Sequence, residues 1–324
     1  MKITDKETIK RILLITLSNI GDIVLTTPVA SALKREFPRA RLDVMSGPAG
    51  KEIFARHPLV RNHIVYDKRA GVRAQQRLIA FLRKKKYDLI VDLRNSLFPV
   101  LIGSRYRTSL LRQPPFSLKH KKDAHLWRLG TIGIRTQDAP FAFYVDERSD
   151  DLVRRLLEDI KITGNFVVVS PGAKSHIKRW SAEGFASVCD RLSSEAGVDV
   201  LLVGDAHDSK IAQRILSLGK RKVIDLTGKL SLRQLGALIR RARLLITNDS
   251  APLHIGSALG TPVLAIFGPT DPAQYGPLSK GDVVLQKNLV CSPCEAAQCR
   301  RQHECMGLIS SDEVVAKAKE MLSR

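Results

Sequence analysis

The sequence predicts an α/β protein with two doubly wound parallel-sheet domains. Short apolar runs without polar alternation recur along the chain and are separated by stretches of helical periodicity. Strands that helices bury on both faces have this pattern. The pattern begins again with a new first strand, FVVVS, at residues 166–170. A chain of 324 residues is also long enough for two domains with separate cores.

Four strands and two helices are expected in the first half of the chain. The strands cover Ile12–Leu17, Leu42–Met45, His63–Tyr66 and Tyr87–Leu93. The helices cover Pro28–Phe37 and Arg73–Lys86. Between Pro99 and Pro140 the chain is rich in Pro, Arg and Lys and shows little clear periodicity.

The second half repeats this alternation after a helix near residues 150–160. Its expected strands cover Phe166–Ser170, Val198–Val203, Val223–Leu226, Leu244–Thr247 and Pro262–Phe267. Its expected helices cover Ala182–Glu195, Ser209–Leu218, Leu232–Arg241 and Asp312–Leu322. We therefore predict domains over residues 1–160 and 161–324, with the last helix either in the second domain or packed back on the first. Two such halves predict a ligand cleft between the carboxyl ends of their sheets.

Two helix starts can be predicted in detail. Ser181 is a good N-cap, and Trp180 and Phe185 occupy the two positions of a hydrophobic staple around it. Ser310 and Glu313 have the spacing of a capping box at the start of the last helix. These caps fix the loops that precede each helix.

The net charge of +21 indicates a polyanionic partner. Residues 1–150 hold 29 Lys and Arg against 14 Asp and Glu, so +15 of this charge lies in the first half. The partner could be nucleic acid, an acidic membrane surface or a phosphorylated substrate. Only 5% of residues are aromatic, and no stacking-rich pattern is present, so we expect no nucleic-acid partner.

The first residues and the cysteine content favour a cytoplasmic protein. The charged start MKITDKETIK precedes only a short apolar strand, unlike a signal peptide, and no apolar run approaches the length of a membrane span. The five cysteines are then more typical of reduced thiols or metal ligands than of disulfides.

The loop after the first strand has an unusual composition. The segment LSNIGDIVLTTP contains one glycine and the carboxylate of Asp22, whereas dinucleotide-binding loops have three spaced glycines and P-loops have Gly-Lys-Ser/Thr. Asp22 therefore stands where a strand–turn–helix unit usually binds phosphate. It is either a catalytic group or simply a helix cap or a buried ion-pair partner.

Two loops of the second half are candidates for anion binding. The segment SPGAKSHIKRW places Lys174, Lys178 and Arg179 between a strand end and a helix start, an arrangement that suits a diphosphate but is also typical of a solvated basic loop. In NDSAPLH, Pro252 marks the first helical turn, so the N–H groups of residues 250–253 form an anion or ribose-hydroxyl site. Alternatively, Asp249 only caps this helix.

Four segments carry a resemblance to a known family. They are LSNIGDIVLTTP, SPGAKSHIKRWSAEGF, NDSAPLHIGSALGTPVLAIFGPTDP and CSPCEAAQCRRQHEC. In this order and spacing, from about Arg11 to the last helix, the chain resembles the ADP-heptose:lipopolysaccharide heptosyltransferases, glycosyltransferase family nine. The resemblance implies a GT-B fold, with two Rossmann-like domains facing across a cleft. The first domain would bind the acceptor and the second the nucleotide-sugar donor.

The resemblance also implies an activity and a set of site residues. The family transfers heptose from ADP-heptose to the lipopolysaccharide inner core, with inversion and without a metal or other cofactor. Asp22 matches its general base. The implied donor-binding residues are Lys174, Ser175, Lys178, Asp249, Ser250, Ala251 and His254. The implied acceptor-binding residues are Ser18, Gly21, Arg105 and Arg107.

One position departs from the family pattern. Ala251 stands where the family has glycine, and alanine can replace it only if the backbone φ angle there is not positive. For His254, a hydrogen bond in the core is the alternative to donor contact.

The basic first half fits the acceptor that the resemblance implies. Lipopolysaccharide inner core carries carboxylates and phosphates and is lipid-linked at the inner face of the inner membrane, so peripheral membrane contact is a hypothesis. The run RAGVRAQQRLIAFLRKKK is a basic amphipathic helix that either lies on anionic lipid or, as we favour, covers the sheet.

The C-terminal cysteines have a compact spacing. Cys291, Cys294, Cys299 and Cys305 are spaced C-x2-C-x4-C-x5-C, and His303 lies among them. This spacing fits a structural zinc site, but partly buried free thiols are the favoured interpretation. Cys189 lies in a helical pattern and is expected in the core.

Three hypotheses on function follow. The first is an inverting heptosyltransferase of the lipopolysaccharide core. The second is a related transferase that uses another nucleotide sugar or adds a branch heptose. The third is a non-catalytic polyanion- or membrane-binding relative. Asp22, Lys178 and Asp249 count against it, because a binding protein needs neither a base nor a diphosphate site.

Overall fold

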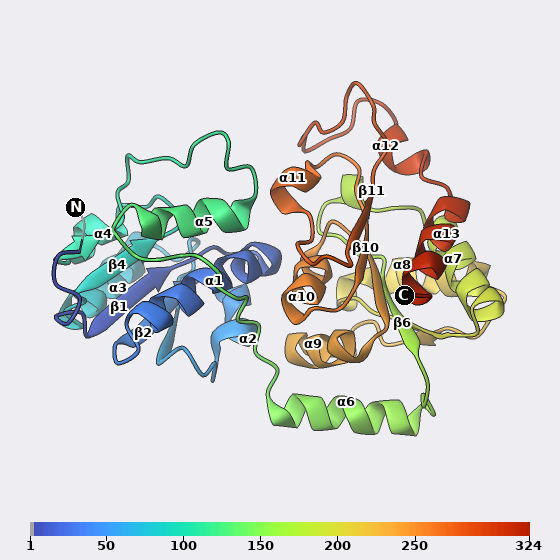
Figure 1. Ribbon diagram of the computed structural model, residues 1–324, viewed down its shortest axis with the longest axis horizontal. Coiled ribbons are helices and arrows are strands. Elements are labelled where there is room, and N and C mark those ends of the chain that lie inside the picture. The colour runs from blue at the N-terminus through green and yellow to red at the C-terminus, as the bar shows by residue number, and fades with distance from the viewer. Residues whose placement is uncertain (1–2) are drawn as a thin grey trace. The chain divides into compact units, whose positions relative to one another are not determined.

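The computed structural model describes residues 3–324 of the chain. The chain divides after Tyr144 into two compact units, each with one parallel sheet covered by helices (Figure 1). The predicted α/β class with two doubly wound sheets is confirmed.

The first unit contains a five-stranded sheet in the order β3-β2-β1-β4-β5. Its strands are β1 (Arg11–Ile15), β2 (Arg41–Ser46), β3 (Asn62–Val65), β4 (Leu89–Asp92) and β5 (Tyr106–Arg107). Its helices are α1 (Ile20–Glu36), α2 (Lys51–Phe54), α3 (Val72–Lys84), α4 (Phe98–Ile102) and α5 (Lys121–Gly130), with a 3-10 turn η1 (Pro48–Gly50). The central strand β1 is buried from Ile12 to Ile15, as expected for a strand that is covered on both faces.

The second unit contains a six-stranded sheet in the order β11-β10-β9-β6-β7-β8. Its strands are β6 (Phe166–Ser170), β7 (Asp199–Leu202), β8 (Ile224–Asp225), β9 (Leu244–Asn248), β10 (Val263–Ile266) and β11 (Val283–Leu285). Its helices are α6 (Glu147–Asp159), α7 (Ala182–Glu195), α8 (Ser209–Leu218), α9 (Leu232–Arg241), α10 (Ala251–Leu259), α11 (Pro272–Tyr275), α12 (Glu304–Gly307) and α13 (Ser311–Leu322). Two 3-10 turns, η2 (His176–Lys178) and η3 (Ala206–Asp208), follow β6 and β7.

The nine predicted strands are all present, but the helix prediction for the first half needs correction. α1 begins at Ile20, and Pro28 lies inside it rather than at its start. Proline has no N–H for the carbonyl four residues earlier. The hydroxyl of Thr27 donates to that carbonyl, on Val24, at 2.8 Å. The helix can therefore continue through Pro28.

Elements that were not predicted are short or lie between Pro99 and Pro140. α4, β5 and α5 form within this basic region, and β11 adds an edge strand to the second sheet. Strands of two or three residues carry too few side chains to show a period. α5 was missed because the polar segment KHKKDAH hides its start.

Both detailed predictions of helix starts are confirmed. Ser181 accepts a hydrogen bond from Gly184 N at 3.0 Å, and the rings of Trp180 and Phe185 lie 5.0 Å apart at a steep angle. Ser310 and Glu313 form the predicted capping box of α13. This last helix packs on α7 and contributes to the core of the second unit.

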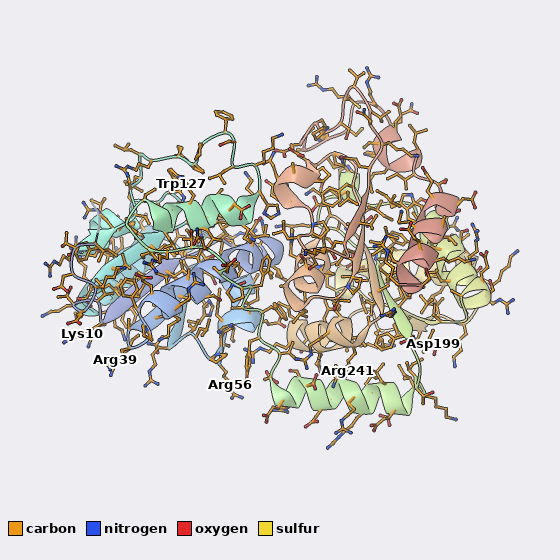
Figure 2. The ribbon with its side chains drawn as sticks, viewed as in Figure 1. Lys10, Arg39, Arg56, Trp127, Asp199 and Arg241 are labelled. Atoms are coloured by element: carbon orange, nitrogen blue, oxygen red, sulfur yellow. The ribbon has the colours of Figure 1, made fainter. Side chains whose placement is uncertain are left out.

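Helix α6 belongs to the second unit, so the division at Tyr144 lies earlier than the predicted boundary near residue 160. Its Asp146 accepts from Arg233 of α9 at 2.6 Å. Asp150 accepts from Arg240 at 2.5 Å and from Arg241 Nη2 at 2.7 Å. Arg241 is labelled at α9, next to α6, in Figure 2. These ion pairs hold α6 against α9.

Replacement of Asp150 by Asn should weaken the packing of α6. Hydrogen bonds from Arg241 lower the pKa of Asp150 below its ordinary value of 3.8. The stabilisation is therefore fully present above pH 3.8 and is lost as the pH falls through the folded-state pKa. Because the pair is partly exposed, we expect a loss of about 0.5–1 kcal/mol at neutral pH. Urea unfolding at several pH values measures it.

The matched control is Asp151→Asn, which removes a more exposed carboxylate from the same helix. Trp180 is buried in the second unit, and Trp127 is the other tryptophan of the chain. In a Trp127→Phe background, fluorescence therefore reports the second unit alone. An equal loss in both variants, or a loss at position 150 that stays the same size however far the pH falls below 3.8, would contradict the role given to this pair.

Candidate functional site

The first candidate group lies after β1 in the first unit. Asn19 is the N-cap of α1, and its side-chain amide donates to Asp22 Oδ2 at 2.9 Å. Asp22 lies in the first turn of the helix, where the N-terminal end of the helix dipole favours a carboxylate. The side chain is neither buried nor fully exposed. Asp22 is therefore an oriented carboxylate at the carboxyl end of a central strand, with access to solvent.

Ser18 and Gly21, two of the predicted acceptor residues, lie in the same turn. Arg94, from the loop after β4, donates to Ser18 Oγ at 3.1 Å and lies 5.1 Å from the ring of Tyr66. Since β1 and β4 are neighbouring parallel strands, their carboxyl-end loops meet at one edge of the sheet. This edge therefore gathers a carboxylate, a hydroxyl and a guanidinium.

Arg94 is not one of the acceptor-binding residues that the resemblance implies. Its position is set by the loop itself, in which Asp92 accepts from the backbone N–H groups of Arg94 and Ser96 at 2.8 and 2.7 Å. Asn95 between them has a φ of +56°, a conformation that asparagine tolerates better than most residues. In the sequence, the Asp-x-x-x-Ser pattern from Asp92 to Ser96, directly after a buried strand, is the feature that could have predicted this turn.

Arg105 and Arg107 lie elsewhere in the first unit. Both are exposed and flank Tyr106 in the edge strand β5. They line an open cavity of about 570 Å3 together with Val100, Leu110 and Leu111. Arg105 and Arg107 therefore line this cavity. The guanidinium that contacts Ser18 belongs to Arg94 instead.

The second candidate group lies at the carboxyl ends of β6, β9 and β10. Lys178 Nζ lies 2.6 Å from Asp249 Oδ2. The hydroxyl of Thr270 donates to the same oxygen at 2.7 Å. Asp249 is only 7% exposed, so its charge needs these partners. One carboxylate thus joins the loops that follow three strands.

Asn248, the residue before this aspartate, fixes the same loops through its side-chain amide. It accepts from Trp180 N at 3.2 Å and donates to Pro171 O at 2.7 Å. The indole of Trp180 donates to Ile309 O at 3.0 Å, just before α13. The predicted donor residues Lys174 and Ser175 lie on the loop held in this way, with Lys174 exposed and Ser175 half-buried.

The start of α10 was predicted as an anion site formed by four N–H groups. Two of these positions do not fit, because Pro252 has no N–H and Leu253 N donates to Ser250 O at 3.2 Å. Ser250 and Ala251 remain as the positions that can present N–H groups to an anion. Ala251 is the first helical residue and is not among those with positive φ, so alanine causes no backbone strain here. His254, on the same helix, is buried.

A further acidic group was not predicted. The carboxylate of Asp208, at the end of η3, occupies the space where a side chain on Gly172 would begin. Burial and the nearby Asp205 raise the pKa of Asp208 above its ordinary value. The sequence gives one sign of this contact, the Pro171-Gly172 pair directly after a strand. Glycine has no side chain, so another group can approach its backbone closely.

The C-terminal cysteines lie beside the loops that carry Lys178 and Thr270, because Ile177 and Pro269 line the same small cavity as the thiols. Cys291, Cys294, Cys299 and Cys305 are free thiols that line a small cavity of about 20 Å3. Cys299 Sγ accepts from the backbone N–H groups of Arg301 and His303 at 3.3 and 3.2 Å. Within residues 3–324, no three His, Cys, Asp or Glu side chains are arranged to hold a metal ion.

Burial raises the pKa of two of the five thiols. It raises the pKa of Cys305 and, at a fully buried position in α7, raises the pKa of Cys189 to about 12. The prediction that Cys189 lies in the core is confirmed.

Comparisons with solved structures define the class of this fold. A family 9 glycosyltransferase from Veillonella parvula DSM 2008 matches with a TM-score of 0.85 at 24% identity, over 97% of both chains. The structure of E. coli ADP-heptose lps heptosyltransferase II matches with a TM-score of 0.80 at 24% identity, over 97% of this chain and 98% of the other. The fold is that of the GT-B glycosyltransferases.

Sequence comparisons identify the family. The model of glycosyltransferase family 9 (heptosyltransferase) matches residues 75–304. The Lipopolysaccharide heptosyltransferase 3 of Escherichia coli is 28% identical over 328 residues, which cover 93% of this chain and 96% of that protein. The Lipooligosaccharide heptosyltransferase 2 of Haemophilus ducreyi is 28% identical over 308 residues, with 85% and 88% covered. This chain belongs to glycosyltransferase family 9 and is a glycosyltransferase.

Gly172→Ala should destabilise the second unit. The added Cβ would lie 2.2 Å from Asp208 Oδ2 and push away the carboxylate that accepts from Asp205 N. Overpacking of this kind typically costs about 1–3 kcal/mol. Urea unfolding followed by Trp180 fluorescence measures the loss.

Two further variants isolate the cause. Gly164→Ala is the control, because no atom beyond its two chain neighbours lies within 4 Å of its added Cβ. In an Asp208→Ala background, which has its own cost because Asp205 N loses its acceptor, Gly172→Ala should cause little further loss, because the obstructing carboxylate is gone. If Gly172→Ala matches the control, the close contact is not significant for stability.

Proposed function

We propose that this protein transfers heptose from ADP-heptose to the inner core of lipopolysaccharide, at the inner face of the inner membrane. The family match and the activities in the relatives' names support this proposal. One solved structure with the same fold is an E. coli heptosyltransferase with ADP. The basic first unit suits an anionic acceptor. None of the helices within residues 3–324 is long and apolar enough to span a membrane.

The observation that carries the proposal is the charged group formed by Lys178, Asp249 and Thr270. Nucleotide-sugar transfer expels a diphosphate, and this leaving group needs positive charge and N–H donors close to it. Lys178 supplies an ammonium group that one short contact to a nearly buried carboxylate holds in place. The amide N–H groups of Ser250 and Ala251, at the start of α10, supply donors at the positive end of a helix.

In the proposed reaction, the first unit supplies the base. The acceptor hydroxyl oxygen forms a bond to the anomeric carbon as the bond from that carbon to the phosphate oxygen breaks. The hydroxyl proton passes to Asp22, and the electron pair of the broken bond leaves with ADP. Direct displacement inverts the anomeric configuration. The comparable base of an inverting glycosidase activates water instead of a sugar hydroxyl.

We extend the proposal to metal-independent transfer, in which Lys178 and the start of α10 meet the charge of the diphosphate. The expected result is that activity of the purified protein is unchanged by EDTA. Loss of transfer in EDTA with recovery on addition of a divalent ion would overturn this part of the proposal alone.

Asp22→Asn tests the proposed base. The variant should bind ADP nearly as well as the parent, while kcat falls by about 10²–10⁴-fold, the usual contribution of general base catalysis. The assay follows ADP release with ADP-heptose and a panel of truncated lipopolysaccharide acceptors. NMR assignment of the anomeric configuration of the product, compared with that of the donor, tests whether the reaction inverts.

The control for this variant is Asp5→Asn, which changes an exposed carboxylate of the same unit. Near-normal turnover in Asp22→Asn would remove Asp22 from the base role. Transfer by the parent from another nucleotide sugar but not from ADP-heptose would favour the related-transferase alternative.

Lys178→Met tests the proposed diphosphate site. Loss of one charge-assisted hydrogen bond corresponds to about 1.5–3 kcal/mol, or about 10- to 100-fold in the Kd for ADP. This variant also leaves Asp249 with fewer partners, so it should lower the melting temperature. Calorimetric titration with ADP measures the Kd.

A second variant separates binding from stability. Lys178→Met with Asp249→Asn removes both charges of the pair, and an amide at position 249 can still accept from Thr270. This double variant should recover stability but not ADP affinity. Recovery of both would mean that Lys178 only neutralises Asp249.

A further inference from the structure

Large apolar side chains are exposed unevenly along the chain. Eight of the thirteen exposed large hydrophobic residues described lie between residues 65 and 116 of the first unit. They are Val65, Val72, Phe81, Leu97, Val100, Leu101, Leu111 and Phe116. Single exposed apolar side chains are normal on a protein surface, but a concentration in one segment indicates an interaction site.

The α4 turn shows that this exposure is not a by-product of core packing. Phe98 and Ile102 point into the core of the first unit. Leu97, Val100 and Leu101 have the i, i+3, i+4 spacing of a second face and are 65%, 50% and 41% exposed. A helical turn that only covered the sheet would carry polar residues on this second face.

The loop between β5 and α5 continues the apolar surface. It extends away from α5 in Figure 1, and Leu111 and Phe116 on it are 92% and 103% exposed. The open cavity of about 570 Å3 connects this loop to α4, since Val100 and Leu111 both line it beside Arg105 and Arg107. We call Leu97, Val100, Leu101, Leu111 and Phe116 the apolar surface.

The charge around the apolar surface has one sign. Residues 93–122 contain seven Lys and Arg and no Asp or Glu. Residues 65–122 contain 15 Lys and Arg against three Asp, which gives +12 of the chain's +21. Of the three aspartates, Asp92 is buried and binds its own loop.

Apolar and basic side chains in one surface suit an anionic bilayer. Aliphatic and phenyl groups enter the boundary between headgroups and acyl chains, while Lys and Arg contact lipid phosphates. A nucleic acid would be expected to use several stacked aromatic rings, whereas four of the five members of the apolar surface are aliphatic.

We propose that the apolar surface and the basic residues around it dock the first unit on a bilayer that contains anionic phospholipid. This inference rests on the proposed function only for the choice of membrane. It concerns how the enzyme reaches a lipid-linked acceptor, and docking and sugar transfer can be measured separately.

The test is sedimentation of the full chain with vesicles. Phosphatidylcholine vesicles with phosphatidylglycerol should bind the protein, and vesicles of phosphatidylcholine alone should bind it at least about tenfold more weakly. Leu111→Ser with Phe116→Ser should weaken binding to the anionic vesicles by about tenfold or more. Arg112→Gln with Lys119→Gln should reduce the difference between the two vesicle types.

Matched controls and a transfer assay complete the design. Leu152→Ser with Val290→Ser removes two exposed apolar side chains of the second unit and should not change vesicle binding. With a lipid-free acceptor fragment, the Leu111/Phe116 variant should transfer sugar at the parent's rate, because only docking is lost. Absence of transfer by the parent would reject the proposed function without affecting the vesicle result.

Three outcomes would overturn the docking proposal. One is that the parent does not sediment with anionic vesicles, and another is that it binds both vesicle types equally. The third is that the Leu111/Phe116 variant binds as strongly as the parent. Self-association of the parent without vesicles, abolished by the same two substitutions, would assign the surface to a second copy of the chain instead.

Discussion

The second unit depends on the pairing of one nearly buried carboxylate. Asp249 lies at the end of β9, and its partners come from the loops after β6 and β10. A carboxylate in this position cannot lose its partners without a large desolvation cost. The loops at three strand ends are therefore fixed relative to one another, and Lys178 is presented in a defined place.

Much of this arrangement could be predicted from the sequence, because strand ends are local features. The buried runs before Asp22, Lys178 and Asp249 placed each of these residues at the carboxyl end of a strand, and the structure finds all three there. Helix caps such as Ser181 were predictable for the same reason, since the partners are a few residues apart.

The other contacts of the candidate site join residues that are far apart in the sequence, so motif spacing does not predict them. Thr270 binds a carboxylate 21 residues away, and Arg94 contacts a serine 76 residues away. Such pairs become visible only once strand order is known. The continuation of α1 through Pro28 likewise depends on one hydroxyl bond from Thr27, which compensates for a missing N–H. The edge strands were too short to show a period.

The hydrogen bond from Trp180 to Ile309 ties the loop that carries Lys178 to the segment just before the last helix. The indole is enclosed on one side by Phe185, and its N–H group ends at the carbonyl just before α13. A truncation that removed Ile309 together with the helix after it would therefore leave a buried donor without its acceptor.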